Sequence, residues 1–432
     1  MLCIYNFYLT RVSIMNKSND DLIILQTRLY YVYNISFLML MFFGVLFSPH
    51  IAFWSCVFLL MGAFSKSKII REGITAIAVA MLLFAAVSRE IGFSLSDDLI
   101  GTYMPILNKW KEYGTFESTG LGIELGIVIY LDFILNFFKI TDARTLLFFC
   151  VLFTLTFYLI WINFFFAKSV DKKEQGMAIA ISLAFMQVGL LTQTLRQEMA
   201  TPFLLMAIYI WDKKKFPSIL FIITATFIHS SSLIIFIFYL LFPSVRLWGK
   251  IFIFAFLFAF SLCISLFPGI VINVFNALYL PFLAKKIQYY LTARASGASE
   301  IIAAGKFYLL IIFIMLANKI FLKKETSRID GISKKIYEFC LWGSICNMSF
   351  VTLPNASRFF LIIPGFFIYY VFLPISKKYP NFFKFLMLVF VLLSLFEPQR
   401  LVGGGIPGFE MWDTYNWFEL TPFYYVSDLF SK

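Results

Sequence analysis

The chain has 432 residues, of which 61% are hydrophobic and only 14% are charged, and its formal net charge at pH 7 is +12. Soluble globular domains are about 45–50% apolar and about 25% charged, so this composition excludes that class. In a membrane protein the excess of lysine and arginine belongs to cytoplasmic loops, and we therefore expect no nucleic-acid partner.

The apolar runs are continuous and do not alternate with polar residues, which excludes a membrane β-barrel and predicts an all-α bundle of transmembrane helices. The six cysteines are scattered singly, with no CxxC and no His/Cys cluster, so neither a disulfide framework nor a metal site is indicated. Basic residues precede the first long apolar run and no small-residue cleavage site follows a short one, which argues against a cleavable signal.

Apolar segments that suit membrane spans of about 20 residues recur along the whole chain. In chain order, the candidate spans are 30–47, 51–64, 70–88, 144–167, 176–193, 197–211, 216–230, 232–245, 250–273, 305–322, 336–352, 357–375 and 382–397. A further apolar segment, 121–140, carries Glu124 and Asp132. It is either another crossing or a re-entrant or interfacial segment.

The bias of lysine and arginine toward cytoplasmic loops distinguishes these alternatives. If 121–140 does not cross, every short basic loop lies inside: 66–71, 168–173, 213–215, 246–250, 319–335 and 377–384. If segment 121–140 crosses the membrane, loops 168–173 and 213–215 fall on the opposite side from loop 66–71. We therefore predict about thirteen crossings plus one re-entrant or interfacial segment, with the N-terminus inside and the C-terminus outside.

On this topology residues 1–432 form a single integral membrane domain, with outer-face loops at 88–143 and 274–304. On this topology several ionisable residues lie at the outer side, although lysine and arginine are usually enriched in cytoplasmic loops. They are Arg89, Asp97, Asp98, Arg196, His229, Arg294 and Arg358. Ionisable residues in or beside membrane spans are candidates for function by default.

The stretch "VSREIGFSLSDDLIGTYMPI" follows the third span and contains Arg89, Asp97, Asp98 and Tyr103. Paired carboxylates can supply a general base or bind a cation. The alternative is a solvated loop with a helix cap, because Ser96 and Asp97 are good N-cap residues before an apolar run.

The next polar stretch, "YGTFESTGLGIELGIVIYLDF", places Glu117 and Glu124 among glycines. A re-entrant segment at this depth is tolerated only where it is buried in protein or lines a cavity. The alternative is an amphipathic helix on the surface.

The stretch "LLTQTLRQEMA" places Arg196, Gln197 and Glu198 between apolar runs, and "TFIHSSSLIIF" ends the following run at His229. The flanking predicted helices are short for a bilayer, which suggests a water-accessible outer cavity. Histidine can act as a base or proton relay, and arginine suits bidentate phosphate recognition. The alternative is an interfacial arginine that snorkels to lipid headgroups.

Two further arginines are expected at the same face, Arg294 in "QYYLTARASGASE" and Arg358 in "LPNASRFFLIIPG". Several arginines at one face with few acids nearby suit a lipid that carries a pyrophosphate.

Taken in order, these segments resemble the EpsG / Wzy family of polysaccharide polymerases, of the O-antigen polymerase type. The most distinctive is "TLRQEMATPFLLMAIYIWDKKKFPSILFIITATFIHSSSLI", which is similar to the family's Arg-Gln, apolar helix, lysine-rich turn, apolar helix and His-Ser pattern. The stretches "SREIGFSLSDDLIGTY", "YGTFESTGLGIEL" and "SRFFLIIPGFFIYY" resemble other family segments. The family's Glu-Pro-Gly is not present, since Ser118 and Thr119 follow Glu117.

The resemblance implies a GT-C-like fold and an inverting, metal-independent glycosyltransferase without a cofactor. Its partners would be undecaprenyl-diphosphate-linked glycan donor and acceptor, membrane lipid and a possible chain-length regulator. It would join oligosaccharide repeat units into O-antigen or a related surface polysaccharide at the periplasmic face of the bacterial inner membrane.

On this hypothesis Arg196 and Arg358 hold the diphosphate, and Arg294 and Arg89 assist. His229 binds the same group or deprotonates the acceptor hydroxyl, and Asp97 or Asp98 is the rival base. The remaining residues expected to contact substrate are Gln197, Glu198, Tyr103, Glu117 and Glu124.

Three alternatives remain open from the sequence. An O-antigen ligase would share the lipid donor and the outer arginines, but its acceptor would be lipid A–core. A flippase or transporter for the same lipid is less favoured, because no inverted repeats are evident. A structural membrane scaffold would not require charges gathered at the outer face.

Overall fold

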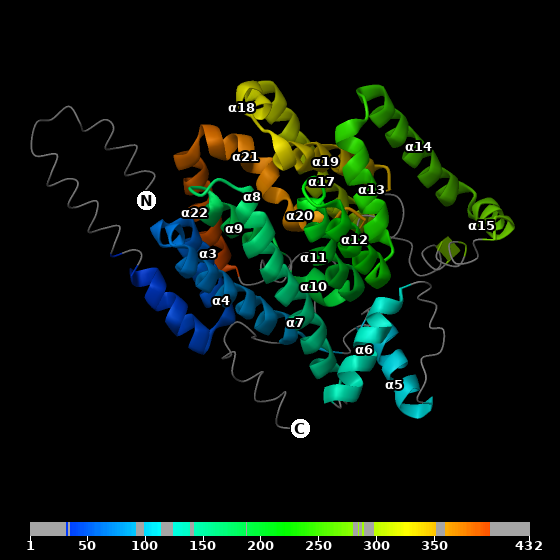
Figure 1. Cartoon of the computed structure of the whole chain (residues 1–432), viewed down its shortest axis with the longest axis horizontal. Coiled ribbons are helices and arrows are strands. Elements are labelled where there is room, and N and C mark those ends of the chain that lie inside the picture. The colour runs from blue at the N-terminus through cyan, green and yellow to red at the C-terminus, as the bar shows by residue number, and fades with distance from the viewer. Residues whose placement is uncertain are drawn as a thin grey trace, which may run out of the picture. The chain divides into compact units, whose positions relative to one another are not determined.

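The computed structural model describes residues 32, 35–91, 99–113, 124–138, 142–186, 188–279, 284, 287, 288, 298–350 and 359–397. Within these ranges every regular element is helical and no strand is formed (Figure 1). This agrees with the predicted all-α class. The chain contains two compact units, which are Met1–Leu95 with Asp142–Gln193 and Ile375–Lys432, and Ser96–Thr141 with Thr194–Pro374.

The first unit is built around α3 and α4, with α7 and α10 packed on α4, and α9 and α22 on α3. Its elements are Ile35–Phe47, α3 (Pro49–Met61), η1 (Ala63–Lys66), α4 (Lys68–Val87), α7 (Ala143–Trp161), η3 (Ile162–Phe166), α8 (Ala167–Ser169), α9 (Gln175–Ala184), α10 (Val188–Gln193) and α22 (Pro380–Phe396). The start of α7 is capped by Asp142, whose carboxylate accepts the N–H of Thr145 at 2.8 Å. The neighbouring Arg144 donates from Nη1 to the carbonyl of Val87 at 2.6 Å, which joins the start of α7 to the end of α4.

The second unit contains the segments that the sequence singles out around Arg196. Its elements are η2 (Leu99–Tyr103), α5 (Met104–Tyr113), α6 (Leu125–Phe138), α11 (Leu195–Ile210), α12 (Lys215–Ile228), α13 (Ser231–Ser244), α14 (Leu247–Leu266), α15 (Pro268–Ala277), α17 (Ala298–Phe321), α18 (Lys323–Ser327), α19 (Gly331–Met348), α20 (Ile362–Phe366) and most of α21 (Ile368–Lys378). Helices α11, α12 and α13 lie side by side, and α6 packs on α12 (Figure 1). In the interior, the hydroxyls of Tyr209 and Tyr370 lie 2.8 Å apart and join α11 to α21.

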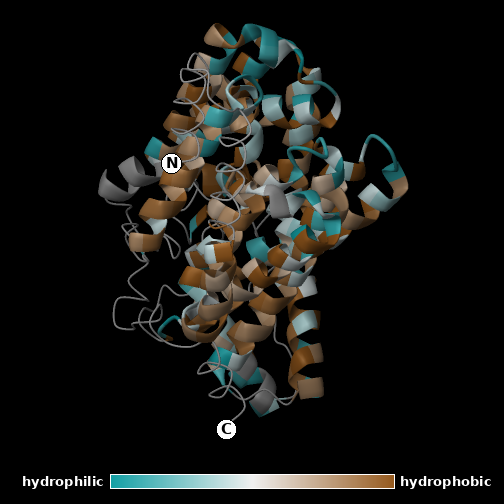
Figure 2. Ribbon diagram, turned by 90° about the vertical axis from the view of Figure 1, so that its left-hand side faces the viewer, coloured by the Kyte–Doolittle hydropathy of each residue, from teal (hydrophilic) through white to brown (hydrophobic). Residues whose placement is uncertain are grey.

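Most helices are apolar along their length, and hydrophilic residues gather mainly near helix ends (Figure 2). In the described part of the chain three helices are long and apolar enough to span a bilayer, namely Lys68–Val87, Ala143–Ser169 and Leu247–Leu266. Several shorter apolar helices accompany them. These features are compatible with a helical membrane protein, and the number of crossings stays a prediction.

Several predicted spans are divided, among them 357–375, in which α20 ends at Phe366 and α21 begins at Ile368. The segment 250–273 is broken between α14 and α15, because Phe267 leaves the helical conformation before Pro268, which begins the next helix. The segment 176–193 is divided into α9 and α10. The predicted interfacial segment 121–140 contains α6, and the predicted outer loop 88–143 contains both α5 and α6.

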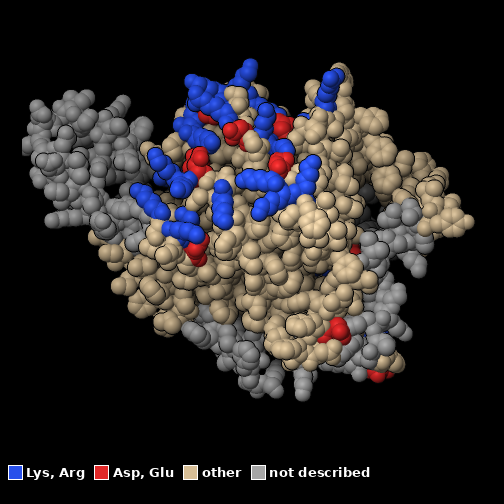
Figure 3. Space-filling model, in the orientation of Figure 1, with Lys and Arg blue, Asp and Glu red and all other residues tan. Residues whose placement is uncertain are grey.

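The second unit has one strongly basic end. The turn between α11 and α12 carries Lys213, Lys214 and Lys215. Lysine and arginine side chains gather around α18 and neighbouring helix ends (Figure 3). Two ion-pair sets lie at this end, Lys335 with Asp212 at 2.5 Å, and Lys250 and Lys319 with Glu338 at 3.2 and 2.9 Å. The two predicted site residues at the ends of this hairpin, Arg196 and His229, lie at the opposite ends of α11 and α12 from the lysine turn.

Gly126 permits the close approach of α6 to α12. A methyl group there would lie 2.9 Å from Ile228 Cγ1 and 3.0 Å from the carbonyl oxygen of Phe227. Because the second contact is with backbone, a larger side chain has to push the two helices apart.

We expect Gly126→Val to lower the free energy of unfolding by about 1–3 kcal/mol, the usual cost of overpacking. Denaturant unfolding of the purified protein in detergent measures it. Gly269→Ala in the first turn of α15 is the matched control, because a methyl group there meets nothing within 4 Å, and it should not lower the free energy of unfolding. Equal stability of the two variants would contradict the close packing of α6 on α12.

Candidate functional site

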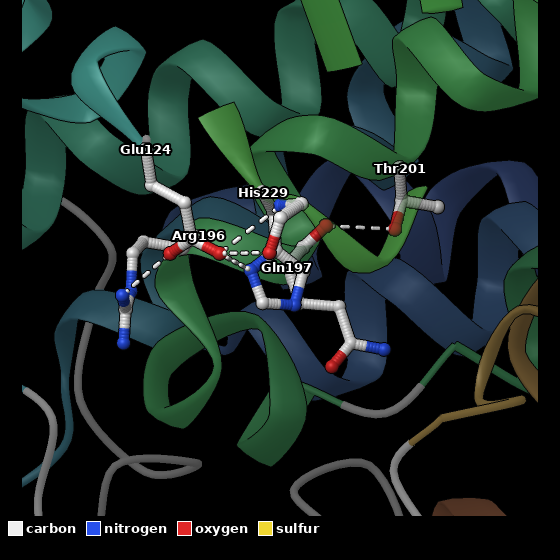
Figure 4. A network of polar contacts seen from close by, with 6 residues as sticks. Glu124, Arg196, Gln197, Thr201 and His229 are labelled. Atoms are coloured by element: carbon white, nitrogen blue, oxygen red, sulfur yellow. Dashed lines mark hydrogen bonds and ion pairs between the residues drawn. The ribbon is translucent and has the colours of Figure 1, made fainter. Parts of the chain in front are cut away.

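Four helix ends of the second unit come together around one side chain. Glu124 immediately precedes α6, Arg196 is the second residue of α11, His229 directly follows α12, and Ser230 directly precedes α13. Figure 4 shows the Glu124 carboxylate reaching between Arg196 on one side and His229 on the other. Residues far apart in the chain therefore form one polar network.

Both oxygens of Glu124 have short polar contacts. Arg196 Nη1 donates to Oε2 at 2.6 Å. Oε1 accepts the backbone N–H of Ser230 at 3.0 Å and the hydroxyl of Ser230 at 2.7 Å, and it lies 3.1 Å from His229 Nδ1. The carboxylate thus ties α11 to the turn between α12 and α13.

The local backbone explains why His229 and Ser230 face Glu124. His229 has extended angles (φ −148°, ψ 114°), which end α12, although its N–H still donates to the Ala225 carbonyl at 2.8 Å. The chain then turns at once into α13, where the Ser232 N–H donates to the His229 carbonyl at 3.1 Å. This tight connection presents the imidazole, an N–H and a hydroxyl to the same side.

The Glu124 carboxylate is more deeply buried than the two side chains that hold it. The Glu124 side chain is 1% exposed, whereas the side chains of Arg196 and His229 are 23% and 18% exposed. Burial alone raises the pKa of the Glu124 carboxyl, but the contacts with His229, Arg196 and Ser230 outweigh it and hold that pKa well below its usual range. Glu124 is therefore ionised at neutral pH, beneath a guanidinium and an imidazole that the protein leaves partly exposed.

The other polar residues in the first turn of α11 have surroundings that differ from those of Arg196. Successive helical residues point about 100° apart, so Arg196, Gln197 and Glu198 face different directions. Glu198 is buried, with 4% of its surface exposed. The Gln197 carbonyl accepts the hydroxyl of Thr201 at 2.8 Å (Figure 4).

The structure brings together three of the residues predicted from sequence, Arg196, His229 and Glu124. Tyr103 is buried in η2 of the same unit, and Arg89 is completely buried after α4 in the other unit. The remaining predicted residues, Asp97, Asp98, Glu117, Arg294 and Arg358, lie outside the described residues, so their places in the site stay predictions.

Ser230 belongs to the network, but it was not predicted as a site residue from the sequence. Its two hydrogen bonds to Glu124 depend on a partner 106 residues away. The available signal was local: a serine directly after a helix-ending histidine is a good N-cap for the next helix. That signal predicts a cap and gives no indication of Glu124.

The first turns of α11 and α13 lie beside Arg196 and His229. Helix N-termini present unpaired N–H groups and a positive dipole end, which favour anions. An arginine adds a charge-assisted donor of the kind that binds phosphate. In the described part of the chain no group of His, Cys, Asp and Glu side chains could hold a metal ion.

Comparisons with known proteins agree with the resemblance in these segments. The family model of the EpsG family matches residues 77–397, which is most of the chain and includes Glu124, Arg196 and His229. No curated protein and no solved structure matches the chain. The chain belongs to the EpsG family, which points to a polysaccharide polymerase-like role.

Proposed function

We propose that this protein is a glycosyltransferase that polymerises undecaprenyl-diphosphate-linked oligosaccharide repeat units into O-antigen or a related surface polysaccharide. Membership of the EpsG family and the many apolar helices support a membrane polymerase. The observation that carries the proposal is the fixed pair Arg196 and His229 beside the first turns of α11 and α13, held from beneath by a buried carboxylate.

This pair suits a reaction in which negative charge develops on a leaving diphosphate. The acceptor sugar's hydroxyl oxygen forms a bond to the anomeric carbon of the donor glycan. The bond from that carbon to the diphosphate oxygen breaks, and its electron pair stays on the diphosphate. The hydroxyl proton goes to a base, and inversion at the anomeric carbon follows from a single displacement.

Arg196 would bind the diphosphate and stabilise the charge that develops on it, since preorganised donors contribute most where charge appears in the transition state. Its Glu124 partner keeps the guanidinium in place before substrate arrives. Arg358, Arg294 and Arg89 are proposed to assist, and Asp97 or Asp98 remains the rival base to His229. Gln197, Glu198, Tyr103 and Glu117 are proposed to contact the sugars or to support these groups.

The proposed orientation places this site at the periplasmic face of the inner membrane. The lysines at the far end of the α11–α12 hairpin support this, because short cytoplasmic loops are enriched in lysine and arginine. Lipid-linked donor and acceptor would reach the site from the outer leaflet, and a chain-length regulator is a possible partner.

Arg196→Ala is expected to abolish long polymer and to leave single capped repeat units, with a rate loss of about 10²–10³-fold from one lost transition-state donor. Gel banding of surface polysaccharide measures it, at matched membrane levels of the protein. Arg196→Lys should recover only part of the activity, because an ammonium lacks the planar fork of arginine. Lys213→Ala at the far end is the control and should leave the banding unchanged.

Normal polymer length in a membrane-inserted Arg196→Ala variant would contradict the proposed site. Loss of all attached repeat units, including single ones, would instead indicate a ligase. Lipid-linked units trapped inside would indicate a flippase, and labelling of surface glycan detects this.

The orientation is tested with single cysteines in a variant whose six native cysteines are replaced. We expect Tyr113→Cys, at the exposed end of α5, to react with a membrane-impermeant maleimide in intact spheroplasts. Lys213→Cys should react only after permeabilisation. The reverse pattern would place the site in the cytoplasm and contradict the proposal.

A further inference from the structure

We infer that Glu124 is a positioning residue that fixes the tautomer of His229, so that Nε2 is the nitrogen that accepts the proton of the acceptor hydroxyl. This inference rests on the proposed function and separates the two roles that remain open for His229, phosphate binding and base catalysis. It assigns to Glu124 a part in the reaction that needs no contact with substrate.

The first step concerns the hydrogen on the imidazole. His229 Nδ1 lies 3.1 Å from Glu124 Oε1, which is a close electrostatic contact and not an aligned hydrogen bond. The oxygens of an ionised carboxylate present only lone pairs, which would repel a nitrogen lone pair at this distance and attract an N–H, so the hydrogen is favoured on Nδ1. In a neutral imidazole one nitrogen carries hydrogen and the other has the free lone pair. That lone pair is therefore on Nε2.

The second step concerns rigidity. Oε1 is held by the N–H and the hydroxyl of Ser230, and Oε2 is held by Arg196, so rotation of the carboxylate would break several bonds at once. The backbone of α6 is also held against Phe227 and Ile228 by the close approach at Gly126. Glu124 thus has one orientation toward His229.

The third step concerns access. Glu124 is nearly fully buried, but 18% of the His229 side chain is exposed. Because Nδ1 is directed at the buried carboxylate, substrate approaches the ring from its other edge, where Nε2 lies. The acceptor hydroxyl can donate its proton there as its oxygen bonds to the anomeric carbon, and the imidazolium that forms is stabilised by the Glu124 carboxylate.

The decisive experiment observes the tautomer without turnover. The chain has only two histidines, His50 and His229, so nitrogen NMR of protein labelled with [¹⁵N]histidine in detergent gives two side-chain signal sets. His50→Gln assigns them. At mildly alkaline pH we expect His229 to carry its hydrogen on Nδ1, and Glu124→Ala to shift it toward the Nε2–H form. An Nε2–H form in the unaltered protein, or no change in Glu124→Ala, would overturn the inference.

A second experiment measures turnover of purified lipid-linked repeat units. His229→Ala should lower kcat by about 10²–10⁴-fold, the range for a general base, and change KM for the donor little, and Glu124→Ala should also lower kcat. Added formate should restore part of kcat in Glu124→Ala, and added imidazole should do so in His229→Ala. A rise in KM with unchanged kcat in His229→Ala would show that His229 binds phosphate, and would overturn the inference.

Two further variants control for folding. Glu124→Gln keeps the volume of the side chain, but its amide has one acceptor oxygen and cannot serve both Arg196 and His229, so kcat should also fall. Ser230→Ala removes one hydrogen bond to Oε1 but leaves the carboxylate, so the loss should stay below about tenfold, the equivalent of one hydrogen bond. If Ser230→Ala and Glu124→Gln lost the same share of kcat at equal stability, the positioning role of Glu124 would be overturned.

The two proposals can fail separately. Polymer formation by a protein whose His229 carries its hydrogen on Nε2 overturns this inference alone. The expected tautomer in a stable protein that transfers no lipid-linked glycan overturns the proposed function, and with it the assignment of Nε2 as a base.

Discussion

A single buried carboxylate, that of Glu124, is the constraint on which the arrangement of the site depends. An ion taken out of water is tolerated only when its partners replace the lost hydration, and here an arginine, an imidazole, a hydroxyl and an N–H do so. Because these groups come from the ends of different helices, their bonds to Glu124 also specify where α6, α11 and the α12–α13 turn meet. The polar contacts of Glu124 and the packing of these helices therefore specify the same arrangement of their ends.

The two ends of the α11–α12 hairpin use charge in different ways. At the lysine end, Lys335 and Asp212 are both well exposed, and ion pairs of this kind add little to stability because water screens them. At the other end, the pair of Glu124 and Arg196 is largely shielded, with the carboxylate 1% exposed. Breaking such a pair from one side leaves an uncompensated charge, so the geometry of the Glu124–Arg196 pair matters more than that of the exposed Lys335–Asp212 pair.

Much of the general organisation could be predicted from the sequence. Continuous apolar runs predict helices, and the lysine-rich turn at 213–215 predicts that Arg196 and His229 lie together at the far ends of two neighbouring helices. The structure confirms both points. The break at Phe267–Pro268 inside a long apolar run was not predicted, because the hydrophobicity of a run says little about where its backbone turns.

What the sequence determined by itself was therefore the helical class, the family pattern and the candidate side chains, because these depend on composition and on neighbours along the chain. The tertiary structure decided that Glu124 is the centre of the network and that Ser230 belongs to it. Their contact joins residues 106 positions apart, and the contact of Glu124 with Arg196 joins residues 72 apart. Such contacts arise only when helices pack and a buried charge has to find its partners, and no local pattern in the chain encodes that requirement.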